Sequence, residues 1–202
     1  MAKLRQAHRY VIAYKPYGVL SAPRDRLGRP TLSSLGIPPT LNPAGRLDLD
    51  SEGLVLVTDD GWLIHRLTHP RYHHPKVYLV MVVGKPSPEA LEQLRRGVKI
   101  KTGWTRRADV ELLSTEPPLP PFPRPLPSPA KRAWLRIVLY EGKKRQIRRM
   151  TAVIGHPTLR LVRVGIGPLR LPPDLKPGQW RDLTPTERRM LFDWVRRHGR
   201  RR

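Results

Sequence analysis

The run of residues from Lys76 to Val83 (KVYLVMVV) constrains the fold of this chain more than any other segment. After its lysine it is continuously apolar and rich in β-branched residues, a pattern typical of a buried β-strand. Further strands are predicted in five segments: Tyr10–Tyr14, Leu54–Val57, Ala108–Leu113, Ala133–Tyr140 and Leu159–Ile166. We therefore expect a sheet of several strands.

Helices are predicted between and after these strands. Their expected positions are Trp62–Leu67 after a cap at Asp59-Asp60-Gly61, Ser87–Arg96, Gly142–Ile154 with Ile147, Met150 and Ile154 on one face, and a last helix from about Pro185. Strands and helices do not alternate regularly. This indicates an α+β fold with a mixed, mainly antiparallel sheet in two lobes flanked by helices.

The predicted elements divide the chain into three regions. These are a basic N-terminal segment (1–9), one domain (10–184), and a C-terminal helix with a basic tail (185–202). Inside the domain, residues 117–129 contain eight prolines without any period, which predicts an extended connection. This Pro-rich loop could be a rigid spacer, a loop that faces a ligand, or a tolerated surface insertion.

The charge of the chain restricts its partners. It carries 39 Lys and Arg against 16 Asp and Glu, a formal net charge of +23. Positive charges in such excess repel one another in the folded protein. Proteins with this charge usually bind a polyanion, most often nucleic acid. A membrane surface is disfavoured because we find neither an apolar span nor an amphipathic helix with a large apolar face. Cysteine is absent, which excludes a disulfide framework and indicates a cytoplasmic protein.

Five carboxylates gather between Asn42 and Gly61 in this basic chain. The segment Gly45-Arg46-Leu47-Asp48 comes just before the predicted strand Leu54–Val57. Loops at strand ends are where a rigid scaffold presents reactive groups, so this segment is a candidate site.

Two patterns suggest metal ligands, and both are incomplete. Residues 48–59 imitate a calcium-binding loop, but its fifth position is Glu, its twelfth is Asp, and its second half predicts a strand. His65 and His69 have helical spacing, with His73 and His74 nearby, but no Glu follows His65 as in zinc proteases. We expect no metal site.

Several blocks of the sequence occur in the order found in one known family. They are Lys15-Pro16-Tyr17-Gly18-Val19, Gly45-Arg46-Leu47-Asp48 with Asp50-Ser51-Glu52-Gly53-Leu54, Lys76-Val77-Tyr78, Glu141 to Met150 (EGKKRQIRRM), and Gly155 to Arg163 (GHPTLRLVR). Over residues 10–183 the chain resembles the RsuA/RluB/E/F family of bacterial rRNA pseudouridine synthases. The resemblance is greatest to members that act on the large subunit and lack an S4 RNA-binding domain. We expect no S4 domain here, because only nine residues precede the first predicted strand.

This resemblance implies a catalytic fold and a set of roles. Asp48 is expected to be the catalytic carboxylate, acting either as a nucleophile or as a base. Tyr78 and Arg148 are expected to complete the catalytic set: Arg148 pairs with Asp48, and Tyr78 stacks on the uracil or also removes the C5 proton. Arg46 is expected to fill the space left by a flipped base or to clamp a phosphate. The residues expected to contact RNA are Arg46, Lys15, Arg145, Arg149, Lys143 and Lys144, with Arg145 and Arg149 on the outward side of their predicted helix.

The resemblance also implies the reaction and its partners. Uridine isomerisation involves no redox change, so no cofactor is expected. The implied substrate is 23S rRNA, in domain V near the peptidyl transferase centre, as naked RNA or in a precursor particle. We expect a monomer, and the many Arg and Pro residues favour a thermophilic source. Two alternatives stay open: a non-catalytic RNA-binding ribosome-assembly factor, and a metal-dependent nuclease.

Overall fold

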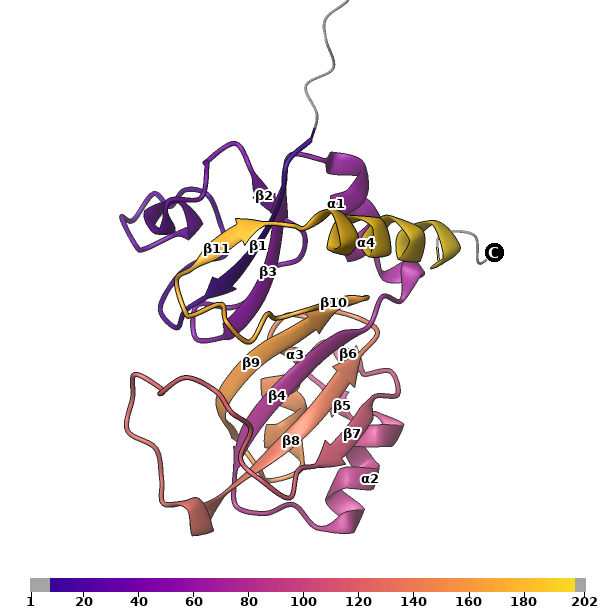
Figure 1. Ribbon diagram of the computed structural model, residues 1–202. Coiled ribbons are helices and arrows are strands. Elements are labelled where there is room, and N and C mark those ends of the chain that lie inside the picture. The colour runs from indigo at the N-terminus through magenta and orange to yellow at the C-terminus, as the bar shows by residue number, and fades with distance from the viewer. Residues whose placement is uncertain (1–7, 199–202) are drawn as a thin grey trace, which may run out of the picture.

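A computed structural model describes residues 8–198 of the chain, and the predicted tail after His198 lies outside them. Seven strands form one sheet in the order β11-β1-β3-β9-β4-β8-β7, and Figure 1 shows how it runs through the molecule. Their bounds are β1 Tyr10–Lys15, β3 Glu52–Thr58, β4 Lys76–Val83, β7 Asp109–Leu112, β8 Arg132–Leu139, β9 Thr158–Ile166 and β11 Trp180–Asp182. Two short strands add to it, β2 (Asn42–Pro43) on β3 and β10 (Leu169–Arg170) on β9. The predicted mixed, mainly antiparallel sheet is confirmed.

The sheet divides into two lobes between β3 and β9. Among the strands of residues 8–198, only these two pair in parallel, over the two residue pairs Glu52–Val162 and Gly53–Arg163. Gly53 has a φ of +105°, and a Cβ added to it would lie 2.3 Å from the Arg163 carbonyl oxygen. Only glycine allows the two strands to approach in this way. In Figure 1, β1, β3, β11, α1 (Gly61–Thr68) and α4 (Pro185–His198) form the upper lobe, and β4, β7, β8 and most of β9 form the lower lobe.

The helices form close to their predicted positions, except at one end. Asp60 caps α1 by accepting a hydrogen bond from the Leu63 amide (3.0 Å), and Ser87 caps α2 (Pro88–Arg96). The helix α3 (Gln146–Val153) begins four residues later than predicted. Arg145 has a left-handed backbone (φ 52°), so residues 142–145 form a loop instead of the first turn of the helix. Arg145 therefore lies before the helix and not on its outer face.

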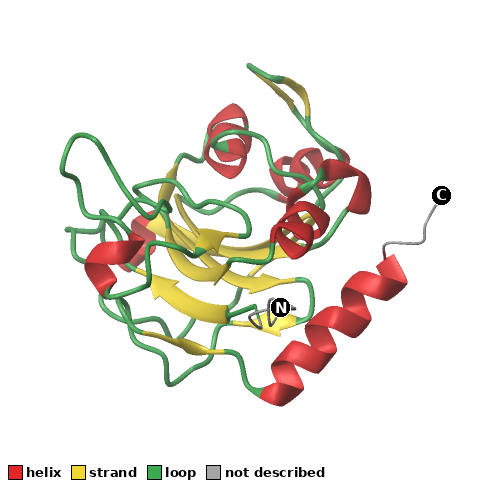
Figure 2. Ribbon diagram, turned by 90° about the horizontal axis from the view of Figure 1, so that it is seen from above, coloured by secondary structure: helices red, strands yellow, loops and turns green. Residues whose placement is uncertain are grey.

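Two apolar cores lie on opposite faces of β3. Val55 and Val57 belong to the larger core, which includes the buried faces of α2 and α3. Leu54 and Leu56 belong to the smaller core beneath α1 and α4. Side chains alternate between faces along a strand, so a strand buried on both faces appears in the sequence as a continuous apolar run. Figure 2 shows the strands at the centre with the helices around them.

The Pro-rich loop folds back onto the body of the protein. The ring of Phe122 packs edge-on against Tyr17 at 5.4 Å and lies 5.0 Å from the Arg160 guanidinium. Arg124 donates a hydrogen bond to the Tyr17 hydroxyl (2.8 Å). Beneath Phe122, Arg160 forms a bidentate ion pair with Glu52 at 2.8 and 2.9 Å, and both side chains are about 5% exposed or less. The loop therefore covers a buried ion pair near the junction of the lobes.

His74 attaches α4 to the segment that precedes β4. The Trp194 Nε1–H donates to His74 Nδ1 (3.0 Å), and the histidine is buried against Tyr72 and His198. Burial, reinforced by the neighbouring His198 and Lys76, lowers the pKa of His74 to about 4. The ring is therefore neutral at pH 7, as its acceptor role requires.

Acidification is expected to destabilise the fold through His74. Between pH 6.5 and 4 the unfolded chain binds a proton at this residue that the native chain does not, so stability falls as the pH falls through that window. The free energy of unfolding should drop by about 2–3 kcal/mol between pH 7 and pH 4.5 from this residue. Urea denaturation of wild type and His74→Gln at both pH values measures it. Equal pH dependence in the two proteins would contradict this assignment.

Candidate active site

A cleft of about 680 Å³ opens where the two lobes meet. The loop of residues 44–51, called here the Asp48 loop, forms one wall together with α1. The other wall is formed by β4, the end of β8 and residues 141–147. Six of the residues predicted for the site line the cleft: Arg46, Asp48, Tyr78, Lys143, Lys144 and Arg145. Segments far apart in the sequence thus converge on one surface.

The Asp48 loop is held by backbone contacts on both sides of Asp48. The Leu47 amide donates to the Ser21 hydroxyl (3.0 Å), and the Ser51 amide donates to the Asp48 carbonyl (3.1 Å). The Asp48 side chain is about one-third exposed at the edge of the cleft. A carboxylate on a fixed backbone can meet a substrate atom without first being ordered.

Arg163 supports the same loop from below. Its guanidinium is completely buried and donates to the carbonyls of Leu54 (2.8 Å), Gly45 (3.0 Å) and Arg46 (3.5 Å). Burial lowers the pKa of Arg163 and the neighbouring Tyr78 opposes this effect, but a guanidinium remains charged in proteins. The sequence patterns did not indicate Arg163 as a site residue. The available signal was a pair of arginines, Arg160 and Arg163, in a strand that is otherwise mainly apolar.

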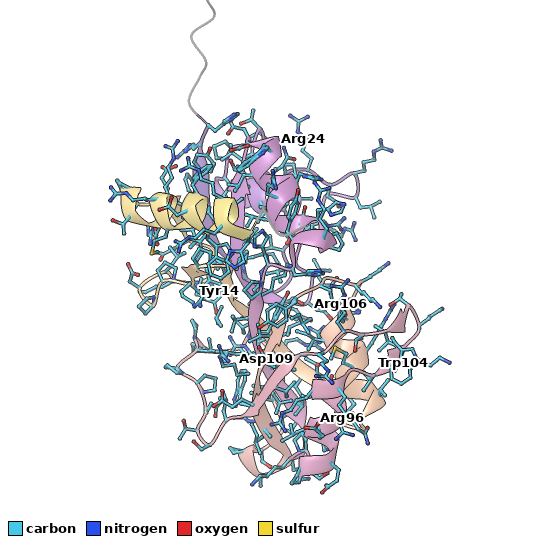
Figure 3. All side chains as sticks on the ribbon, turned by 90° about the vertical axis from the view of Figure 1, so that its right-hand side faces the viewer. Tyr14, Arg24, Arg96, Trp104, Arg106 and Asp109 are labelled. Atoms are coloured by element: carbon cyan, nitrogen blue, oxygen red, sulfur yellow. The ribbon has the colours of Figure 1, made fainter. Side chains whose placement is uncertain are left out.

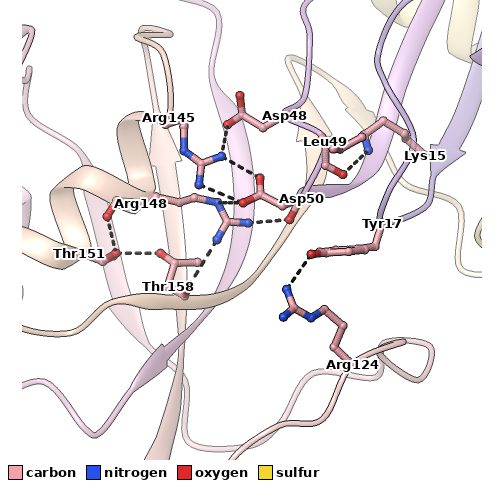
Figure 4. Close-up of polar contacts among 10 residues, drawn as sticks. All are labelled: Lys15, Tyr17, Asp48, Leu49, Asp50, Arg124, Arg145, Arg148, Thr151 and Thr158. Carbon is pink, nitrogen blue, oxygen red and sulfur yellow. Dashed lines mark hydrogen bonds and ion pairs between the residues drawn. The ribbon is translucent and has the colours of Figure 1, made fainter. Parts of the chain in front are cut away.

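The arginines next to the Asp48 loop are arranged differently from the prediction. Arg145 makes a bidentate ion pair with Asp50 (2.9 and 3.0 Å) and reaches within 4.0 Å of the Asp48 carboxylate (Figure 4). Arg148 instead contacts Asp50, with Nε 3.3 Å from its carboxylate and Nη2 2.6 Å from its carbonyl oxygen. Among the described ion pairs Arg148 is bonded to Asp50 and not to Asp48, while its charge still interacts with the Asp48 carboxylate. The pairing of Arg148 with Asp48 stays a prediction. The late start of α3 places Arg145 in a loop that faces the Asp48 loop.

The charge of Asp50 is stabilised by these two arginines. Burial alone would raise the pKa of Asp50, but the hydrogen bonds from Arg145 and the charge of Arg148 hold the pKa below its ordinary value. Asp50 therefore joins the Asp48 loop to the start of α3 through charged hydrogen bonds, which are stronger than neutral ones.

Lys15 does not belong to an RNA-contacting surface. Its side chain is fully buried, and its ammonium donates to the carbonyls of Val19 (2.6 Å), Pro16 (2.9 Å) and Leu49 (3.5 Å). Burial lowers the pKa of Lys15 to about 8. The predicted RNA contact is wrong because the lysine ties the turn after β1 to the residue that follows Asp48.

Tyr78 and Lys76 lie on the β4 wall of the cleft. Tyr78 is 9% exposed and lines the cleft with its ring. The Lys76 ammonium donates to the His74 carbonyl (3.2 Å), and burial, together with the positive charge of Arg163, lowers the pKa of Lys76 to about 8. The family resemblance predicted Tyr78 as a site residue but gave Lys76 no role.

Arg149 lies differently from the other basic residues of its segment. It was predicted to point outward, but it is half-buried, with its Nη1 enclosed, and it is absent from the cleft lining. Arg46 and Lys144 are exposed at the cleft and Lys143 is half-buried there. Basic side chains thus surround the opening of the cleft without Arg149 or Lys15.

The acidic and histidine side chains of the two metal-like patterns do not come together in one site. Glu52, the fifth position of the imitated calcium loop, is paired with Arg160, and residues 52–58 form β3. Within residues 8–198, no group of three or more His, Asp or Glu side chains has an arrangement that could hold a metal ion. In the same part of the chain, no helix has both the length and the apolar character needed to cross a bilayer.

Known proteins share the sequence and the architecture of this chain. Residues 9–153 match the family model of RNA pseudouridylate synthases. Ribosomal large subunit pseudouridine synthase E of Xanthomonas campestris is 51% identical over 177 residues, covering 85% of this chain and 93% of that protein. The synthase of the same name from Vibrio vulnificus is 45% identical, covering 90% and 78%. A solved pseudouridylate synthase structure superposes with a TM-score of 0.78 at 29% identity, covering 93% of this chain and 75% of that one.

Proposed function

Because the chain belongs to the RNA pseudouridylate synthase family, we propose that it isomerises a specific uridine of 23S rRNA to pseudouridine with Asp48 as the catalytic carboxylate. The observation that carries this proposal is the position of Asp48, on a fixed loop at the edge of a cleft, opposite Tyr78 and 4.0 Å from Arg145. Relatives named as large subunit synthases support the choice of rRNA. The proposed target region is domain V, near the peptidyl transferase centre.

The reaction breaks the bond between N1 of uracil and C1′ of the ribose. The uracil turns while it stays bound, and C5 bonds to C1′. The C5 hydrogen leaves as a proton to a base, for which Tyr78 is the candidate, and N1 takes up a proton in place of its lost bond. In this proposal Asp48 attacks C1′ or removes a ribose proton, and either role requires an ionised carboxylate. The Arg145 guanidinium, 4.0 Å away, places a positive charge beside this carboxylate. The Tyr78 ring packs on the uracil and holds it while it turns.

Release of tritium from 23S rRNA transcribed with 5-tritiated uridine tests this function. C5 loses its hydrogen only when the new carbon–carbon bond forms, so wild-type protein should release about one equivalent per RNA. Excess chelator should have little effect on an RNA that remains folded. No release from naked RNA or from precursor particles would reject the synthase and favour the assembly factor. RNA cleavage that chelator abolishes would favour the nuclease.

Arg46 is expected to occupy the space that the flipped uridine leaves. It is exposed at the cleft two residues before Asp48, and its backbone carbonyl accepts a hydrogen bond from Arg163, while no described residue is bonded to its guanidinium. A uridine in folded RNA must leave its stack at a cost of a few kcal/mol, which a stacking guanidinium would offset. Arg46→Ala should lower the turnover of folded RNA by roughly 10- to 100-fold and regain it on a short unpaired substrate. Equal loss on both substrates would indicate a phosphate clamp instead.

A further inference from the structure

Trp104 is exposed on a hairpin of the lower lobe. The short strands β5 (Lys99–Ile100) and β6 (Gly103–Trp104) form the hairpin, Trp104 pairs with Lys99 next to its base, and Figure 3 shows Trp104 on this projecting hairpin. The side chain is 67% exposed. Within residues 8–198 no aromatic ring or guanidinium packs on it, whereas exposed Trp62 stacks on Phe192. A single exposed apolar side chain is not by itself a binding site, so the charges around Trp104 decide what it could bind.

The base of the hairpin is fixed. The Thr105 amide donates to the Val98 carbonyl (3.0 Å), and the Val98 amide donates to the Thr105 hydroxyl (2.9 Å). Gly97 has a φ of +98°, and a Cβ there would lie 2.4 Å from the Thr105 carbonyl oxygen. The chain therefore closes tightly at this point, which fixes the backbone from which Trp104 projects and lowers the entropic cost of ordering that backbone on binding.

The surface around Trp104 is strongly positive. Residues 99–107 contain four basic residues and no acidic one, and two lysines of the neighbouring 142–145 loop add to them. The basic residues of this surface are Lys99, Lys101, Arg106, Arg107, Lys143 and Lys144. Apart from the half-buried Lys143, all of them are exposed. We call residues 99–107 the basic hairpin.

The basic hairpin is continuous with the cleft. The Lys143 ammonium donates to the Trp104 carbonyl, and Lys143 itself lines the cleft. The Arg106 amide donates to Glu141 (2.8 Å), which also accepts from Gln146 (2.7 Å) at the start of α3. A strand of RNA leaving the cleft along this side would meet Trp104 after the loop of residues 142–145.

We propose that the basic hairpin binds a single-stranded segment of the RNA substrate, with Trp104 stacked on an unpaired base that flanks the target uridine. This inference rests on RNA being the substrate. One exposed aromatic ring among basic side chains is the arrangement that binds single strands, because the ring stacks on any base while the cations contact phosphates. A protein partner would need a wider apolar surface than a single indole, and no acidic side chain of the hairpin is available to it.

Binding of two labelled RNAs to the full-length protein tests this surface. One probe is an oligouridylate of roughly ten nucleotides, and the other is a blunt duplex of similar length. Trp104→Ala should weaken binding of the oligouridylate about 10-fold and leave duplex binding unchanged, whereas Trp104→Phe should stay within about threefold of wild type. Lys101→Glu should weaken the binding of both probes and reduce the salt dependence of the Kd. Trp62→Ala is the matched control and should change neither Kd.

Two results would overturn the proposal. One is unchanged oligouridylate binding by Trp104→Ala, and the other is an equal loss on both probes. Tritium release separates this proposal from the proposed function. If wild type releases tritium and Trp104→Ala keeps both its Kd and its KM, the hairpin proposal fails and the synthase stands. If wild type releases none but Trp104→Ala loses single-strand binding, the synthase fails and the RNA-binding hairpin stands.

Discussion

Asp48→Asn is expected to abolish tritium release from 23S rRNA while RNA binding is retained. The amide is nearly isosteric with the carboxylate, so the contacts of the Asp48 loop with Ser21 and Arg163 should persist. It can neither attack C1′ nor accept a ribose proton. Loss of a group that forms or breaks bonds typically lowers the rate by about 10⁴-fold or more. Single-turnover tritium release, with Kd measured on the same RNA, gives both quantities.

The control for this experiment is Asp59→Asn, at an exposed carboxylate outside the cleft. Its rate should equal that of wild type. An Asp48→Asn protein that still releases tritium at more than one-hundredth of the wild-type rate would exclude Asp48 as the catalytic carboxylate. An Asp48→Asn protein that also loses RNA binding would show that the loop had collapsed, and only then would Asp48→Glu be needed to separate charge from shape.

Glu52→Gln is expected to destabilise the fold more than other single substitutions of charged residues. Arg160 is 4% exposed and would keep its charge in a site with no other carboxylate bonded to it among the described residues. Removing one partner of a buried ion pair costs about 3–5 kcal/mol, because the remaining charge is left without compensation. Urea denaturation at pH 7 measures the loss.

An exposed ion pair with the same geometry provides the comparison. Arg9 makes two hydrogen bonds to Asp182, at 2.7 and 2.9 Å, with both side chains about half exposed. Asp182→Asn should cost less than about 1 kcal/mol. The double variant Glu52→Met with Arg160→Met should recover much of the stability that Glu52→Gln loses, because no buried charge remains. Equal costs for Glu52→Gln and Asp182→Asn would contradict this account.

The sequence predicted the elements well where burial determines them. The strand Lys76–Val83 matches β4 at both ends, and the cap at Ser87 starts α2 as expected. Short apolar runs give a strong signal because strands in the centre of this sheet are covered on both faces. The strands β2, β5, β6, β10 and β11 were not predicted. They have two or three residues each, too few to show a period.

Side-chain roles were harder to predict than elements. The outward position of Arg145 assumed that a helix began at Gly142, and a left-handed residue removes that turn. A lysine in a turn motif suggested a surface contact, yet three carbonyls that meet only in the folded state surround Lys15. Such contacts depend on tertiary structure, and no local pattern encodes them. The residues of the Asp48 loop were predictable because they are contiguous.

The support that Arg163 gives to the Asp48 loop also limits when the site can form during synthesis. The hydrogen bond from Arg163 to the Gly45 carbonyl joins residues 118 positions apart. The ribosome adds about 5–20 residues per second, so Asp48 leaves the ribosome several seconds before its support exists. A nascent chain or fragment that ends before β9 carries every residue of the Asp48 loop but not the cation that fixes its shape. The Asp48 loop therefore takes its supported shape late, after β9 has been synthesised and has paired with β3.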